Sequence, residues 1–314
     1  RLYRGAIEDE VCFLRLIEAT YEGESERFWE LSRCLNAVPT PEEMRYALEG
    51  VRSVLLQGLL RPELVDVCQR LIQVLDEQFH LSFDLSSGNE EAQGSPRADA
   101  QTSARLQQKV TAQAARRFFE AVLHESGYEG WQVVIDPKTS GPRVEAGLRQ
   151  LFLPDTPLSL ERLRHYLSHE LAGHVARAVN GENSLLGLLG INTRGYMPTE
   201  EGLALYQERQ VAALYGQEFD DSVLWMGALA TGLASGVAAP AQTFRSLFTF
   251  FEAFHLLARL VERYDDDMPT AQEKARKAAL ATCLRTYRGV PDLTQAGVCY
   301  TKDIVYLRGI RLIE

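Results

Sequence analysis

Two histidines and a glutamate stand close together in the segment Ser168-His169-Glu170-Leu171-Ala172-Gly173-His174. In zinc peptidases, one helix carries two histidine ligands, and a glutamate beside the first histidine acts as general base. The segment therefore suggests a zinc site with His169 and His174 as ligands and Glu170 as the catalytic base. A pair of hydrogen-bonded core histidines is the alternative interpretation, and a third ligand is needed to decide between them.

The spacing of the two histidines differs from the usual one in zinc peptidase helices. They stand five residues apart, which places them roughly 140° apart around a regular α-helix, too far to share one metal. A short π-helical turn would return both side chains to one face, and such turns concentrate at functional sites. Gly173 would ease the distortion because it carries no Cβ. We therefore expect a π-helical irregularity at this motif.

A third ligand is expected from the segment Pro198-Thr199-Glu200-Glu201-Gly202-Leu203-Ala204. Thr199 is a candidate N-cap, which would place both glutamates in the first turn of a helix, where they would also complement the helix dipole without any metal. Neighbouring residues on a helix differ by about 100°, so only one of the two can point into a site. A di-metal carboxylate bundle is disfavoured, because it requires Glu-x-x-His on two helices, whereas Glu170 and His174 stand four residues apart and their motif has no second copy.

Taken together, these two segments resemble the QEGLA-motif family. Its bacterial members are described as flavohemoglobin expression-modulating proteins, and its relatives include a microtubule-associated tyrosine carboxypeptidase. The resemblance extends from about residue 108 to the C-terminus and includes Trp131-Gln132-Val133 and Thr301-Lys302-Asp303-x-x-Tyr306-x-x-Gly309. It implies a zincin-like fold in which His169, His174 and Glu201 bind Zn²⁺ and Glu170 is catalytic. Glu200 stands where the family name has glutamine.

A carboxypeptidase also needs a cation for the terminal carboxylate of its substrate. The chain from residue 283 onward is locally basic, and Arg288 and Lys302 are the preferred candidates for this role. Tyr300 and Tyr306 are candidates for stabilising the oxyanion or lining a side-chain pocket. Ordinary surface charges and core tyrosines are the alternative interpretations of all four residues.

The function favoured by this reasoning is a zinc metallocarboxypeptidase that removes a C-terminal residue, such as tyrosine or another bulky side chain, from a peptide or protein tail. A metalloendopeptidase would need an open cleft and no carboxylate clamp. A non-catalytic zinc-binding module, which regulates expression or binds a partner, is the third hypothesis. The presence of Glu170 argues against this third hypothesis, because a peptidase homologue that has lost its activity tends to lose its catalytic base first.

The elements that must position these residues are mainly helices. Apolar residues recur at helical spacing through residues 8–83, and Thr40-Pro41-Glu42-Glu43 is typical of a helix start. Residues 86–103 lack large apolar side chains and indicate a linker. We then expect a helix over 104–126, strands over 131–135 and 148–153, a short extended piece at 143–145, and helices from 157 onward. The pattern predicts an α+β, mostly helical, zincin-like fold with a small sheet before the zinc-binding helix.

This organisation suggests three regions: an N-terminal helical region (1–85), a linker or mobile loop (86–103), and a catalytic domain (104–314). The N-terminal helices are candidates for covering the site or binding a protein partner. The stretch 222–244 carries no charge, but its many small residues favour a buried helix over a membrane span.

Composition excludes some classes of protein. The chain has 314 residues and a formal net charge of −10, so a nucleic-acid binder is disfavoured. No signal peptide is visible. The five cysteines show no paired spacing, which predicts reduced thiols and a cytoplasmic location.

Overall fold

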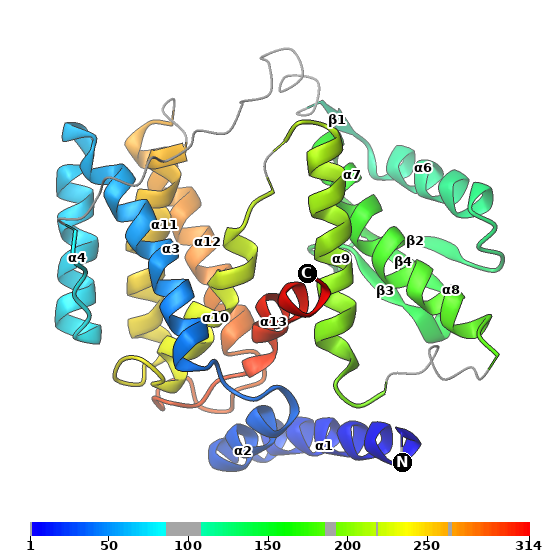
Figure 1. Ribbon diagram of the computed structural model, residues 1–314, viewed down its shortest axis with the longest axis horizontal. Helices are drawn as coiled ribbons and strands as arrows, with labels where there is room; N and C mark the ends of the chain where they lie inside the picture. Colours follow the sequence, from blue (N-terminus) through cyan, green and yellow to red (C-terminus); the bar gives the residue numbers. More distant parts are fainter. Residues whose placement is uncertain (1, 86–107, 186–192, 218, 263–265) are drawn as a thin grey trace. The chain divides into compact units, whose positions relative to one another are not determined.

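The computed structural model describes residues 2–85, 108–185, 193–217, 219–262 and 266–314 (Figure 1). Helices predominate over a small sheet, which confirms the expected α+β class. The chain divides into two compact units. As far as the structure describes them, the first comprises Arg1–Tyr3, Ala92–Asp220 and Arg308–Glu314, and the second comprises Arg4–Glu91 and Asp221–Leu307.

A three-stranded sheet forms the centre of the first unit. Strands β2 (Gln132–Asp136) and β4 (Gln150–Pro154) are parallel, and β3 (Arg143–Glu145) pairs antiparallel with β4. The order is therefore β2-β4-β3, and the predicted strands are confirmed to within two residues. A second, two-stranded sheet pairs β1 (Lys109–Val110) with β5 (Leu158–Ser159) and was not expected.

Helices surround this sheet. Helix α6 (Ala112–Glu125) contacts β2 and β4. Strand β3 contacts a π-helix (Leu167–Val175). This π-helix follows α7 (Leu160–Tyr166) directly and is followed by α8 (Ala176–Glu182). Helix α9 (Tyr196–Leu214) packs on the π-helix. The expected helix start at residue 104 is wrong by several residues, because β1 precedes α6. The N-terminus of α6 is capped by Thr111, whose side chain accepts a hydrogen bond from the Ala114 N–H.

The core of the first unit holds the π-helix against the sheet. Val133, Leu151 and Leu153 of the strands are buried, together with Phe119 of α6 and Val175 of the π-helix. Burial of side chains of this size contributes about 1.5–3 kcal/mol each relative to leaving them exposed. The backbone of the histidine motif is thus fixed by core packing on both sides of its sequence.

The second unit is built from helices. It contains α1 (Leu2–Glu22, apart from its first residues), α2 (Ser25–Asn36), α3 (Pro41–Leu59), α4 (Val65–Phe79), α10 (Ser222–Ser235), α11 (Phe244–Glu262) and α12 (Met268–Thr286). Single turns of 3₁₀-helix occur at Pro62–Leu64 and Thr301–Asp303, and another at Ala146–Leu148 in the first unit. The helix start at residue 40 is confirmed, because Thr40 and Glu43 form a reciprocal capping box. Helix α13 (Ile304–Ile313) begins in the second unit and ends in the first.

The grouping of these helices differs from a division into consecutive regions at residues 86–103. Helix α11 packs on α3 and α4 as well as on α12, so chain segments from both sides of that stretch share one core. Phe79 and Phe250 illustrate this, with their ring centroids 5.2 Å apart. The stretch 86–103 itself lies outside the described residues.

Helix α10 is buried, as its small residues predicted. A Cβ built at Gly232 would lie 1.9 Å from the Met44 Sδ, so glycine permits the close approach of α10 to α3.

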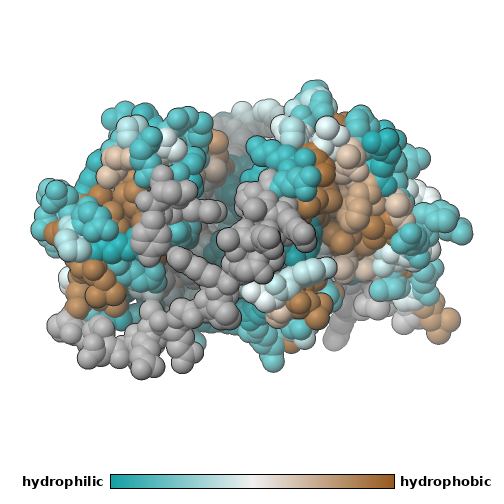
Figure 2. Space-filling view, turned by 90° about the horizontal axis from the view of Figure 1, so that it is seen from above, coloured by the Kyte–Doolittle hydropathy of each residue, from teal (hydrophilic) through white to brown (hydrophobic). Residues whose placement is uncertain are grey.

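No helix among the described residues has the length and hydropathy needed to cross a bilayer. Hydrophilic residues and separate hydrophobic patches share the molecular face shown in Figure 2. All five cysteines are free thiols, and three of them are buried.

Candidate metal centre

The histidine motif adopts the predicted irregular backbone. Residues Leu167–Val175 form a π-helix, so the expectation of a π-helical distortion is confirmed. A wider turn returns residues five apart to the same side of the helix. The imidazole rings of His169 and His174 consequently have centroids only 5.0 Å apart.

Gly173 has a second role, in packing, that the sequence did not suggest. A Cβ at this position would lie 2.8 Å from the Ala204 Cβ and 3.0 Å from the Ala204 Cα. Because such distances are too short for carbon atoms, glycine is what allows α9 to approach the π-helix this closely. The approach matters because α9 carries both candidate glutamates.

A pair of glycines also fixes the other side of α9. A Cβ built on Gly202 would lie 2.2 Å from the carbonyl carbon of Gly309 in α13. The two helix backbones therefore touch directly beside Glu201. This contact gives a structural reason for a glycine after Glu201 and for a glycine at position 309.

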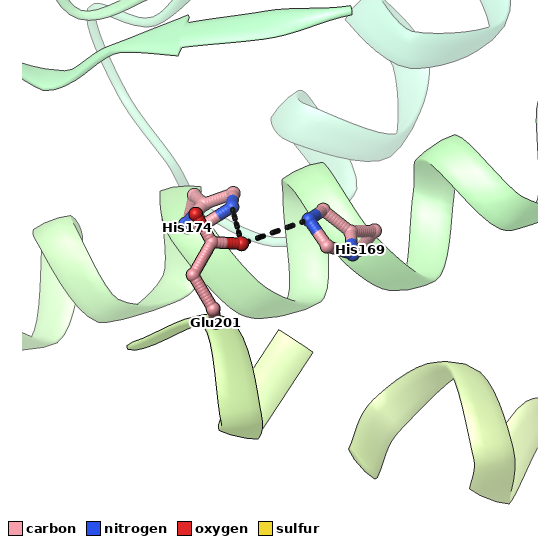
Figure 3. Close-up of side chains that lie close together, drawn as sticks. All are labelled: His169, His174 and Glu201. Atoms are coloured by element: carbon pink, nitrogen blue, oxygen red, sulfur yellow. Dashed lines mark ion pairs between the residues drawn. The ribbon is translucent and has the colours of Figure 1, made fainter. Parts of the chain in front are cut away.

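Three side chains converge at the centre of this arrangement (Figure 3). The Oε2 atom of Glu201 lies 3.6 Å from the Nε2 of His169 and 3.9 Å from the Nε2 of His174. One donor atom from each of the three residues lies within 4.8 Å of the other two. Two imidazoles and one carboxylate form the donor set of several catalytic zinc sites, which leave a fourth position open.

The structure separates the roles of the two adjacent glutamates. Glu201 faces the Nε2 atoms of both histidines, whereas Glu200 Oε1 lies 2.8 Å from the Nδ1 of His174 and 2.8 Å from the Nε of Arg177. Only Glu201 belongs to the cluster of three, as expected from the 100° angle between neighbouring helical residues.

The predicted start of this helix at Thr199 is wrong. Helix α9 begins at Tyr196, after Gly195 in the left-handed conformation (φ 72°). Pro198 is compatible with the first turn, where a backbone N–H has no partner within the helix. The first turn contains no acidic residue, so helix capping does not account for Glu200 and Glu201.

Each histidine of the cluster contacts a second carboxylate through its other ring nitrogen. His169 Nδ1 is hydrogen-bonded to Glu208 Oε1, and Glu208 Oε2 lies 2.9 Å from the Nδ1 of the exposed His165. Glu200 makes the equivalent contact with His174. Metal-binding histidines in proteins are oriented by partners of this kind.

These contacts determine which ring nitrogen is available to a metal. Ionised carboxylates only accept hydrogen bonds, so His169 and His174 donate through Nδ1 to Glu208 and Glu200. A neutral imidazole that donates through Nδ1 keeps its lone pair on Nε2. Both lone pairs therefore belong to the nitrogens that face Glu201. The donor set and its orientation fit a zinc ion.

The pKa values of the site reflect crowded carboxylates. Burial alone would lower the pKa of His169, but the neighbouring carboxylates of Glu201 and Glu208 raise it to about 10. Burial raises the pKa of Glu170, against the opposing effect of the two histidines. The pKa of Glu208 is lowered, because its bonds to His165 and His169 outweigh its burial. The surroundings thus favour positive charge at His169, and a bound divalent cation would supply positive charge at the same point.

Two participating residues were missed at the sequence level. Glu208 follows Glu201 by seven residues, which is two helical turns and therefore the same face of α9. Arg177 follows His174 by three residues, which also places the two side chains on one face. Both spacings were visible in the sequence. Their meaning depended on knowing that α9 packs on the π-helix.

The four residues expected to bind substrate belong to the second unit, whereas the metal cluster belongs to the first. Arg288 is exposed, and its guanidinium lies 5.4 Å from the centroid of the Tyr300 ring. Tyr306 lies beside Arg285, which also forms an ion pair with Asp303. Lys302 is half-buried in the turn before α13.

Comparisons with known proteins found no match among family models, curated protein sequences or solved structures. The evidence for the chemistry of the site therefore consists of its own residues. They provide a three-donor metal cluster, two oriented imidazoles and a buried glutamate next to the first ligand.

Proposed function

We propose that this chain is a zinc-dependent metallopeptidase with a zincin-like active site. The observation that carries the proposal is the convergence of His169, His174 and Glu201 donor atoms within 4.8 Å on two packed helices. The π-helix supports the proposal, because this distortion brings two histidines five residues apart to the same side of the helix, where both can bind one metal ion.

Each residue has a defined task in this proposal. A zinc ion held by His169, His174 and Glu201 would acidify a water molecule at its open position and polarise the carbonyl of the scissile peptide. Glu170 accepts the proton of the attacking water and returns it to the leaving amine. The burial that raises the pKa of Glu170 suits a group that must both accept and release a proton near neutral pH.

We further propose that the enzyme acts as a carboxypeptidase on peptide or protein tails. Arg288 is the candidate for binding the terminal carboxylate, and its exposed guanidinium lies beside the Tyr300 ring. A guanidinium in this state can bind a terminal carboxylate through two hydrogen bonds. Lys302, Tyr300 and Tyr306 are the further candidates for substrate binding. The free thiols are the basis for proposing a cytoplasmic location.

The test compares zinc-loaded wild-type protein with Glu170→Ala on a mixed peptide pool, with every product identified by mass spectrometry. Removal of single C-terminal residues by the wild type alone is the expected result. Glu129→Ala, an exposed glutamate in the turn after α6, is the matched control and should behave as the wild type.

Other results of this experiment would support one of the alternative functions or refute the proposal. Internal cleavage would make the protein an endopeptidase. Stoichiometric zinc without cleavage would indicate a non-catalytic zinc module, and absence of zinc binding would refute the whole proposal.

A further inference from the structure

Strand β2 forms one edge of the three-stranded sheet. Its neighbour on one side is β4, and within the described residues no strand lies on its other side. The opposite edge is β3, which contacts the π-helix that carries the histidines. The β2 edge is thus opposite the strand that makes this contact.

The register shows which backbone groups of β2 turn outward. The Gln132 N–H donates to the Arg149 carbonyl at 2.9 Å, and Gln132 is aligned with Gln150 in the parallel ladder. In a parallel pair, alternate residues direct both backbone groups to the same neighbour. Gln132, Val134 and Asp136 therefore bond to β4, and the N–H and C=O groups of Val133 and Ile135 turn away from it.

A groove of about 690 Å³ runs along this outer edge. Gln113, Arg116 and Glu120 of α6 line it together with β2, and Asp155 lies in its wall. Arg116 and Glu120 are ion-paired at 2.8 Å, so this wall presents charges of both signs. The groove is polar, as expected for a place where backbone hydrogen bonds remain to be made.

Trp131 adds a second observation in the same wall. The residue is 8% exposed and lines the groove, and its Nε1 is buried with no hydrogen-bond partner among the described residues. A buried indole N–H usually finds an acceptor. The strand edge and the indole thus leave three N–H donors and two carbonyl acceptors along one short segment.

We propose that this groove binds an extended segment of a partner protein, which adds to the sheet as a strand beside β2. Only an extended chain presents donors and acceptors at the two-residue period of Val133 and Ile135. Pairing with the β2 edge of a second copy is a separate outcome, which the oligomeric state distinguishes. The proposal is independent of the metallopeptidase assignment.

The test uses Ile135→Pro in the full-length chain. Proline removes the outward N–H of Ile135 and leaves the bonds of Val134 and Asp136 to β4 in place, a position where sheets tolerate proline. A displayed library of random twelve-residue peptides is selected on the wild type alone, and the selected peptides are then measured on both proteins. We expect selected peptides to bind the wild type and to lose at least tenfold in affinity on Ile135→Pro. Ile135→Val, which keeps the N–H and the branched side chain, should bind them as the wild type does.

Hydrogen exchange gives a measurement that does not depend on the variant folding. A selected peptide should slow amide exchange in residues 131–137 of the wild type. The proposal is overturned if the selection yields no binder, if every binder protects another segment, or if Ile135→Pro binds as the wild type does while keeping its thermal midpoint. A dimeric mass for the wild type and a monomeric mass for Ile135→Pro would instead assign the edge to a second copy.

Discussion

At the scale of single residues, the metal centre depends on carboxylates that do not touch the metal position. Glu208 bridges His165 and His169, and Glu200 bridges His174 and Arg177. Each bridge fixes the tautomer and the rotation of one imidazole. The sequence indicated both histidines, Glu170 and the alternative between Glu200 and Glu201. It did not indicate the bridges, because they join two helices whose packing the sequence does not state.

Glu208→Gln tests the role of the first bridge. The amide keeps the size of the side chain but removes its charge, so His169 should be held less firmly. Loss of such a partner typically costs 10–100-fold in metal affinity, and we expect a loss in this range. Competition with a chromophoric zinc chelator would measure it. Glu129→Gln serves as control, and unchanged affinity for Glu208→Gln would show that the bridge is dispensable.

His255 gives a prediction about stability against pH. Burial in α11, where its ring stacks on Phe251, lowers its pKa to about 4. An unfolded chain has a histidine pKa of about 6.5, so between these values the unfolded state binds more protons. The stabilising effect is therefore complete well above pH 6.5 and is lost as the pH falls toward 4, by about 2.5 kcal/mol at pH 4.5.

Denaturant unfolding of the wild type and His255→Gln at pH 7.5 and pH 4.5 would measure this effect. The wild type should lose more stability on acidification than the variant, because glutamine does not titrate. Equal losses in both proteins would show that the histidine is protonated without penalty in the folded state.

At the scale of elements, contacts between helix backbones position the ligands. The π-helix approaches α9 through Gly173, and α9 approaches α13 through Gly202 and Gly309. Sequence periodicity predicted the helices and the three main strands. The predicted start of α9 was wrong, because Thr199 followed by two glutamates matched a capping pattern. The helix instead begins after Gly195, which is its N-cap residue. Sequence periodicity also missed β1 and β5, since two-residue strands are too short to show a period.

Gly202→Ala tests the α9–α13 contact. Its new Cβ would lie 2.2 Å from the backbone of Gly309, so the helices must separate. Overpacking of this kind usually costs about 1–3 kcal/mol of stability, and we expect at least about 2 kcal/mol here. Thermal unfolding would measure the loss. Gly147→Ala, where a Cβ meets nothing within 4 Å, is the matched control and should change stability by about 0.5 kcal/mol or less.

At the scale of the whole molecule, neither unit is continuous in sequence. The composition of residues 86–103, which lie outside the described residues, predicted a linker, but it did not reveal that helices on both sides share one core. Which helices share a core depends on long-range side-chain packing, such as that of Phe79 against Phe250. Local sequence patterns do not encode this packing. The separation of the chain into a helical region and an independent domain 104–314 is therefore open to a direct test.

Expression of residues 108–314 alone provides that test. The fragment lacks α3 and α4, so apolar side chains of α11 that pack on them would become exposed. We expect it to be aggregated or to bind a hydrophobic dye, and to regain solubility when residues 1–85 are co-expressed. A soluble, monomeric fragment with cooperative unfolding would show instead that the region folds independently.

The contact between Gly202 and Gly309 also has a thermodynamic consequence. Helix α13 rests on α9 one residue after Glu201, so a ligand that immobilises Glu201 also favours the docked state of the last helix. Linkage requires the converse, that anything loosening the C-terminus weakens metal binding by the same factor. Zinc should therefore slow amide exchange in residues 308–313, and a C-terminal affinity tag should lower zinc affinity more than an N-terminal one. The last turns of the chain would then act as an effector of the metal centre without contacting the metal.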